Sequence, residues 1–238
     1  FANSEMAAAA TPDSLELRIM EKYRDRLPEE AFSTIYQPPS TDGRGLRANL
    51  RQARRLLAAA GWQIAEGVLV DSASGDAMTI KFLLSRSSYE RVLGPVQQNL
   101  QRLGIQSRIR TVDTSQYWNR LQQFDYDVVV RSWRQYDSPG NEQRNYWTSK
   151  AAHSPGSRNY AGIADPAVDQ LVELLIAASD RDHQVAIARV LDRALQWGHY
   201  VIPLWHAVDD RLITWDRFGR PDTLPGKDLG IIRTWWVR

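Results

Sequence analysis

Apolar residues along the middle of the chain alternate between strand-like and helix-like spacings. Runs that suit buried strands lie at residues 78–84, 106–112 and 126–133. Amphipathic patterns that suit helices lie at residues 88–103 and 165–197. Strands that alternate with helices form a sheet whose faces the helices cover. We therefore expect the three strands to share one sheet, covered by the helices at 88–103 and 165–197.

Capping residues refine the helix boundaries. Asp165 followed by Pro166 is a typical helix start, and Asp180 can begin a second helix within the same segment. Thr114 or Ser115 can cap a short helix between the second and third strands. The sequence thus predicts three capped helices in addition to the long amphipathic one.

The remaining segments give weaker signals. A helical pattern near residues 46–60 carries four arginines on its polar side, Arg47, Arg51, Arg54 and Arg55. An anion site is conceivable there, although a solvated helix face is the favoured interpretation. A last strand is expected at residues 200–205, whereas residues 209–238 are rich in Trp, Arg, Gly and Pro and show no periodicity.

Composition indicates a globular binding or enzymatic protein and argues against nucleic acid as a partner. The 238 residues are 43% hydrophobic and 24% charged, and the net charge is only +2. Cysteine is absent, so disulfides and thiolate metal sites are impossible. The chain also starts without an initiator methionine, at Phe1. A removed leader and a longer parent protein both remain open.

The segment from Asp125 to Trp147 is the most informative part of the chain. Trp133 lies at the end of an expected buried strand. A turn at Pro139-Gly140 follows and leads into a stretch of charged, amide and aromatic side chains. Open α/β folds keep their ligands at such a sheet edge. The segment contains no nucleophile with an adjacent base, so it predicts a surface that holds a ligand.

Enzyme motifs give little support to catalysis. The sequence contains no Gly-x-Ser-x-Gly elbow, no P-loop and no His-Glu-x-x-His motif. His199 and His206 flank the last expected strand and would lie at its opposite ends rather than in one metal site. We therefore expect no catalysis, no metal site and no cofactor.

Several spaced motifs together resemble a known family. They are NLRQARRLLAAAGW, the long stretch from TIKFLLS to DYDVVVRSW, NYAGIADPAVDQLVELL and YVIPLWH. This order resembles family 5 extracellular solute-binding proteins, the peptide-binding receptors of ABC importers. The stretches FANSEMA, SPGNEQRNYW and WDRFGRP resemble the branch that includes the microcin C receptor. Such segments lie in the C-terminal part of a much longer chain, so the resemblance implies a fragment.

The resemblance implies an α/β fold, a lobe of the type II periplasmic binding protein class with a mixed sheet covered by helices. Residues 1–208 would form this C-terminal substrate-binding lobe, and residues 209–238 a tail that returns toward the missing N-terminal lobe. The two lobes would close over a peptide or peptide-like ligand and present it to ABC permease subunits. The implied location is the periplasm, either free or lipid-anchored on the outer face of the cytoplasmic membrane. An alternative is a non-catalytic interaction domain that binds a protein partner through its Trp-rich tail.

The same resemblance bears on the residue that would hold the peptide's α-amino group. In many family members a Trp is followed three residues later by an Asp that pairs with this group. Here the Trp is Trp133, and Tyr136 occupies the position of the Asp. The nearest carboxylates are Asp137 and Glu142, and Asp137 can replace the usual anchor if it points toward the ammonium.

Other residues of the segment are candidates for ligand contacts, each with a structural alternative. The predicted ligand-binding set is Trp133, Arg134, Tyr136, Asp137, Asn141, Glu142, Arg144 and Trp147. The two tryptophans can stack on the ligand or belong to the core. The arginines can grip a carboxylate or phosphate, or be solvated or paired with Glu142. Asn141 and Gln143 can bind peptide backbone or stabilise the loop. Tyr117 and Trp118, on the preceding helix, can face the ligand, although core packing is the favoured interpretation.

Overall fold

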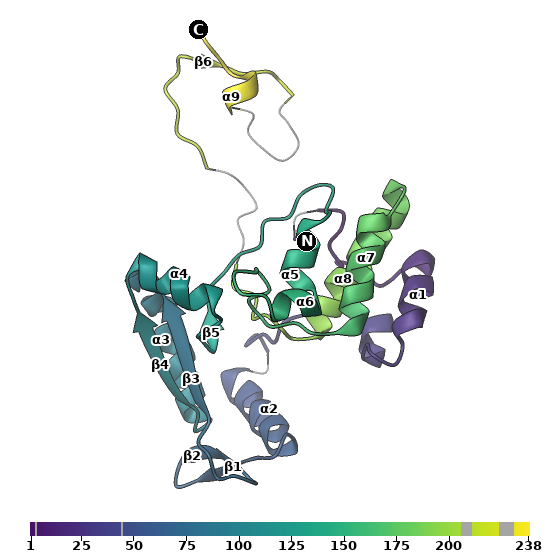
Figure 1. Cartoon of the computed structure of the whole chain (residues 1–238). Helices are drawn as coiled ribbons and strands as arrows, with labels where there is room; N and C mark the ends of the chain where they lie inside the picture. The colour runs from purple at the N-terminus through teal and green to yellow at the C-terminus, as the bar shows by residue number, and fades with distance from the viewer. Residues whose placement is uncertain (3, 44, 206–210, 224–230) are drawn as a thin grey trace. The chain divides into compact units, whose positions relative to one another are not determined.

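The computed structural model describes residues 1–238 except 3, 44, 206–210 and 224–230. The chain divides into two compact units, one of residues 1 and 3–202 and one of residues 2 and 203–238. The larger unit contains a parallel sheet with its covering helices, a helical core and a small hairpin (Figure 1).

The three predicted strands do share one sheet. β3 (Thr79–Leu84) lies between β4 (Gln106–Thr111) and β5 (Val128–Val129), and both neighbours run parallel to it. The prediction of a strand over 126–133 is wrong in length. Val128 pairs with Phe82 and Val129 with Leu83, so residue 130 would oppose the last residue of β3. Within the described residues, those beyond it pair with no strand, and the chain leaves the sheet.

Two helices cover the sheet, one on each face. Phe82 and Leu84 pack with Leu93 of α3 (Glu90–Arg102), which follows the short turn η3 (Ser87–Tyr89). Leu83 points to the opposite face and packs with Tyr117 and Leu121 of α4 (Thr114–Gln122). The cap of α4 differs from the prediction, because the Asp113 carboxylate accepts the N–H of Gln116 and takes the role expected of Thr114 or Ser115.

The helices at 165–197 do not cover the sheet as predicted. They are α7 (Pro166–Ala177) and α8 (Arg181–Trp197), capped as expected by Asp165 and Asp180. Their apolar stripes pack against each other, and mainly against α1 (Ser14–Met20) and α5 (Glu142–Trp147). Since α3 and α4 already cover the sheet, these stripes form a second core of their own.

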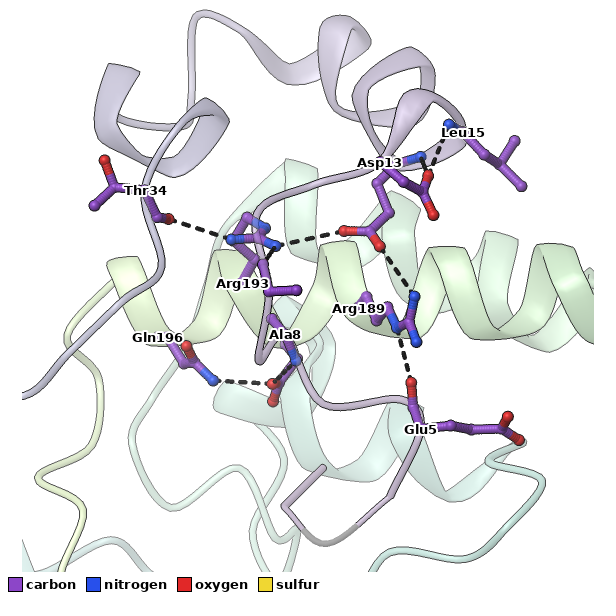
Figure 2. A network of polar contacts seen from close by, with 11 residues as sticks. Glu5, Ala8, Asp13, Leu15, Thr34, Arg189, Arg193 and Gln196 are labelled. Carbon is purple, nitrogen blue, oxygen red and sulfur yellow. Dashed lines mark hydrogen bonds and ion pairs between the residues drawn. The ribbon is translucent and has the colours of Figure 1, made fainter.

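Residues 14–32 form short helical turns on this second core. α1 continues into η1 (Glu21–Tyr23), and η2 (Glu29–Phe32) follows. Figure 2 shows polar contacts that tie residues 5–34 to α8. The Asp192 carboxylate accepts the N–H of Ala8 at 2.9 Å, and the Arg193 guanidinium donates to the Ala10 carbonyl at 2.7 Å. Glu16 lies 3.4 Å from both Arg189 and Arg193.

The predicted helix near residues 46–60 is α2 (Gly45–Ala59), and it leads into a hairpin of β1 (Trp62–Ala65) and β2 (Val68–Asp71). The apolar side of α2 packs on the hairpin, whereas all four arginines are exposed. The strand β1 was not foreseen. The turn residues Glu66 and Gly67 both have positive φ, which suits a tight hairpin connection.

The predicted strand at 200–205 is absent. Val201, Ile202, Leu204 and Trp205 are exposed instead and pair with no other strand in the described part of the chain. The second unit holds a short antiparallel pair, β6 (Phe218–Gly219) and β7 (Trp236–Val237), and a turn of helix, α9 (Ile231–Thr234). It exposes apolar side chains, among them Trp215 at 79% and Trp236 at 53%. Its role as a returning tail remains a prediction, and part of residues 209–238 lies outside the described residues.

Candidate functional site

The predicted ligand-binding segment is an irregular connection that starts at the carboxyl edge of β5 and ends in α5. A short helix, α6 (Ser149–Ala152), and a loop over residues 153–164 follow it. This loop returns to the segment, because the Arg158 carbonyl accepts the indole N–H of Trp133 at 2.9 Å. The segment is thus held at a fixed place beside the parallel sheet.

The two predicted tryptophans have different surroundings. Trp133 is half-buried, with its ring centroid 5.2 Å from that of Trp147 and 5.7 Å from that of Tyr160. Trp147 is 6% exposed and belongs to the second core. Its indole N–H donates to the Gln143 side chain at 2.8 Å. Trp147 therefore packs against the ring of Trp133 on the side of the core, and Trp133 is closer to solvent.

Three of the predicted polar residues mainly hold the loop together. Arg144 forms a two-point ion pair with Glu173 of α7, with its Nε 2.7 Å from Oε1, and its third contact is the Asn141 side-chain oxygen. Arg144 thus pairs with Glu173 and not with Glu142. This arrangement fixes the first turn of α5 to α7.

Glu142 stabilises the turn that begins α5. Its carboxylate accepts the N–H of Gly140 at 2.9 Å and the amide of Gln143 at 3.1 Å. Partial burial would raise the pKa of Glu142, but these hydrogen bonds outweigh burial and hold the pKa below its usual value. Glu142 is therefore a charged structural acceptor at neutral pH.

The remaining predicted residues, Arg134, Tyr136 and Asp137, are exposed between Trp133 and the start of α5. The Arg134 guanidinium lies 5.5 Å from the ring centroid of Tyr136. The Asp137 carbonyl accepts a hydrogen bond from Arg181 of α8, which anchors the backbone at this point. Among the eight predicted residues, these three are exposed and Trp133 is half-buried, so ligand contact by them stays a prediction.

The structure adds a hollow that sequence reasoning missed. It has a volume of about 200 Å³ and lies between α4, the end of β5 and the 156–160 loop. Its lining includes Trp118, Arg131, Arg158 and Tyr160. Trp118 is 45% exposed and so is not a core residue, whereas Tyr117 is 6% exposed and packs in the core. That Trp118 faces a ligand stays a prediction. Arg131 was hidden from the sequence analysis because it fell inside the strand expected over 126–133.

Arg131 lies between two aromatic rings in this hollow. Its guanidinium carbon is 5.2 Å from the Trp118 ring centroid and 4.7 Å from that of Tyr160, and its Nη2 donates to the Tyr160 hydroxyl at 3.0 Å. Burial by itself lowers the pKa of Arg131, but the interactions with the hydroxyls of Tyr160 and Tyr117 together outweigh burial and keep the pKa above its usual value. The hollow therefore contains a permanent positive charge.

Comparison with known proteins shows the family of the chain. Residues 22–155 match the family described as bacterial extracellular solute-binding proteins, family 5 middle region. The chain belongs to family 5 of the bacterial extracellular solute-binding proteins. The resemblance seen in the sequence is thereby confirmed.

Relatives within family 5 align with nearly the whole chain. The protein y4wM of Sinorhizobium fredii is 44% identical over 100% of this chain, and the probable peptide-binding protein YejA of Agrobacterium fabrum is 42% identical over 99%. The chain spans only 36% and 39%, respectively, of the lengths of these two relatives. It therefore corresponds to less than half of such a protein.

Solved structures confirm the expected fold class. The oligopeptide-binding protein AppA of Bacillus subtilis, solved with a nonapeptide, matches 98% of this chain and 47% of its own with a TM-score of 0.61. Its sequence identity is 19%, so the likeness concerns the fold. In the described part of the chain, no helix is both long and apolar enough to span a bilayer. The described residues also bring together no trio of histidine, aspartate or glutamate side chains suited to a metal.

Proposed function

We propose that this chain is part of the substrate-binding component of an ABC importer that captures oligopeptides or peptide-like compounds. The observation that carries the proposal is membership of family 5, whose relative in Agrobacterium fabrum is named as a probable peptide-binding protein. The proposed role is binding without catalysis. It follows that the partners are a peptide-like ligand, the permease subunits and the remainder of the parent protein, in the periplasm or on the outer face of the cytoplasmic membrane.

The proposed contact surface is the exposed part of the segment after β5. Trp133 offers a ring face braced by Trp147, and Asp137 offers a carboxylate on a backbone fixed by Arg181. Asn141, Glu142 and Arg144 hold the start of α5 and so keep this surface in place. A rigid surface is what a clamp needs, because ordering a mobile loop on binding would reduce the affinity.

The proposed mechanism is closure of two lobes over the ligand. Binding would shift an equilibrium between open and closed forms by the difference in ligand affinity between them. This chain would supply one surface of the closed form and the rest of the protein the other.

The test is native mass spectrometry of ligands that copurify with the full-length protein, expressed in its own periplasm. We expect bound oligopeptides or peptide conjugates that are displaced when excess synthetic peptide is added. A protein that copurifies only with sugars or metal chelates, and that gives no calorimetric signal with a mixed peptide library, would rule out the proposed ligand class.

A further inference from the structure

The hollow beside Trp118 has an electrostatic character that the peptide-binding proposal does not require. None of the described residues that line it carries a negative charge, and two of them, Arg131 and Arg158, are positive. Neither arginine forms an ion pair within the described part of the chain. The hollow is therefore a concentration of uncompensated positive charge.

Burial makes this charge costly for the free protein. Arg131 is only half exposed at most, and its Nε is buried without an acceptor among the described residues. Its nearest partners are the rings of Trp118 and Tyr160 and the hydroxyls of Tyr160 and Tyr117, none of which carries a full negative charge. Aromatic faces stabilise a desolvated cation less than a carboxylate can. An anion in the hollow would supply the missing partner.

The hollow also offers several hydrogen-bond donors. The Tyr160 hydroxyl accepts from Arg131 and keeps its own proton for a further acceptor. The Arg158 guanidinium is exposed, while its backbone carbonyl is fixed by Trp133. The exposed ring of Trp118 adds an apolar wall. A volume of about 200 Å³ suits a carboxylate or phosphoryl group with a short linker rather than a whole peptide.

We propose that the hollow formed by Trp118, Arg131, Arg158 and Tyr160 binds an anionic side group of the ligand, so that the protein selects acidic peptide-like compounds. This inference rests on the proposed peptide-binding function and narrows its ligand class. Arg158 is the specificity-determining residue, because its guanidinium is exposed at the hollow and free to form a two-point contact. Arg131 supplies the fixed charge that attracts the group.

The test compares matched peptides on the full-length protein by isothermal titration calorimetry. We expect a tetra-alanine peptide with one Glu to bind about tenfold more tightly than the same peptide with Gln, the effect of one charge-assisted hydrogen bond. Arg158→Gln should reduce this preference to about twofold or less, and Arg158→Lys should retain part of it. Arg108→Gln removes the same charge from an exposed position on β4 outside the hollow and should leave the preference unchanged.

Each outcome decides one of the two proposals. Equal affinity for Glu and Gln peptides at every position in the wild-type protein would overturn the anion subsite and leave peptide binding intact. A wild-type protein that binds no peptide would end the proposed function. In that case titration with glutarate decides the subsite separately: binding that is lost in Arg158→Gln but not in Arg108→Gln supports it, and no binding overturns it.

Discussion

Arg193 of α8 should be among the most sensitive positions of the second core. Its side chain is 1% exposed and donates to the carbonyls of Ala10 and Thr34 and to the carboxylate of Glu16. Arg193→Met removes all three contacts while filling a similar volume. Breaking a buried ion pair costs about 3–5 kcal/mol, because the remaining charge has no partner.

The structure favours a loss of unfolding free energy near the lower end of that range. Glu16 keeps Arg189 at 3.4 Å, and both of its contacts with arginine are long. Burial, and next the nearby charge of Asp13, already raise the pKa of Glu16, so the carboxyl can take up a proton when Arg193 is lost. We therefore expect Arg193→Met to lower the free energy of unfolding by about 3 kcal/mol.

Urea unfolding followed by tryptophan fluorescence measures this loss. The matched control is Arg189→Met, whose side chain is 34% exposed, and it should cost about 1 kcal/mol. The double variant Arg193→Met with Glu16→Gln should be more stable than Arg193→Met alone at neutral pH, since it removes the buried carboxylate, while the more exposed Arg189 keeps the Glu5 carbonyl. A loss below about 1 kcal/mol for Arg193→Met would refute the view that this network holds residues 1–34 on α8.

Three further outcomes follow from the described contacts. Asp137→Asn in the full-length protein should weaken peptides with a free α-amine about tenfold and acetylated peptides much less; equal losses in calorimetry would disprove the anchor role. Because the pKa of Glu16 is raised, the folded state binds its proton more tightly than the unfolded chain does. Wild-type protein should therefore gain stability relative to Glu16→Gln as the pH falls from above the folded pKa to below 4.5. Urea midpoints of the two proteins that change in parallel across that window would contradict the shift. This chain alone should bind peptides poorly and associate through residues 209–238, where Trp215 and Trp236 are exposed. Sedimentation with and without that segment tests this, and a clean monomer with micromolar peptide affinity would show that one lobe suffices.

Local signals in the sequence predicted the helices well. Asp165, Pro166 and Asp180 each act at a helix start as their chemistry suggests, since a short carboxylate beside an open helix end accepts its free N–H groups. Asp113 was overlooked in favour of Thr114 and Ser115, although the same chemistry favours it. The alternation of strands and helices correctly predicted that β3, β4 and β5 share one sheet.

Failures came where tertiary pairing decides the structure. The valines at 128–130 and the aromatic residues around them predicted a long strand, but β3 ends at Leu84 and leaves residues 131–133 unpaired. Residues 200–205 are equally apolar, yet they find no neighbouring strand in the described part of the chain. The apolar stripes of α7 and α8 also do not indicate which element they pack against. The structure shows that they pack against α1 and α5 and not against the sheet. An apolar pattern indicates that a surface is buried, but it does not indicate which element covers that surface.

The same limit explains which candidate residues changed role. Arg144 and Glu142 were sound candidates by residue type, but Glu173 and Gly140, their actual partners, lie in places that spacing does not reveal. Arg131 was passed over because an arginine inside a predicted strand is normally a solvated side chain. Once the strand ends at Val129, the same arginine stands at the carboxyl edge of a parallel sheet, between two aromatic rings and without a carboxylate. The early end of β5 is thus what turns a strand residue into a candidate binding group.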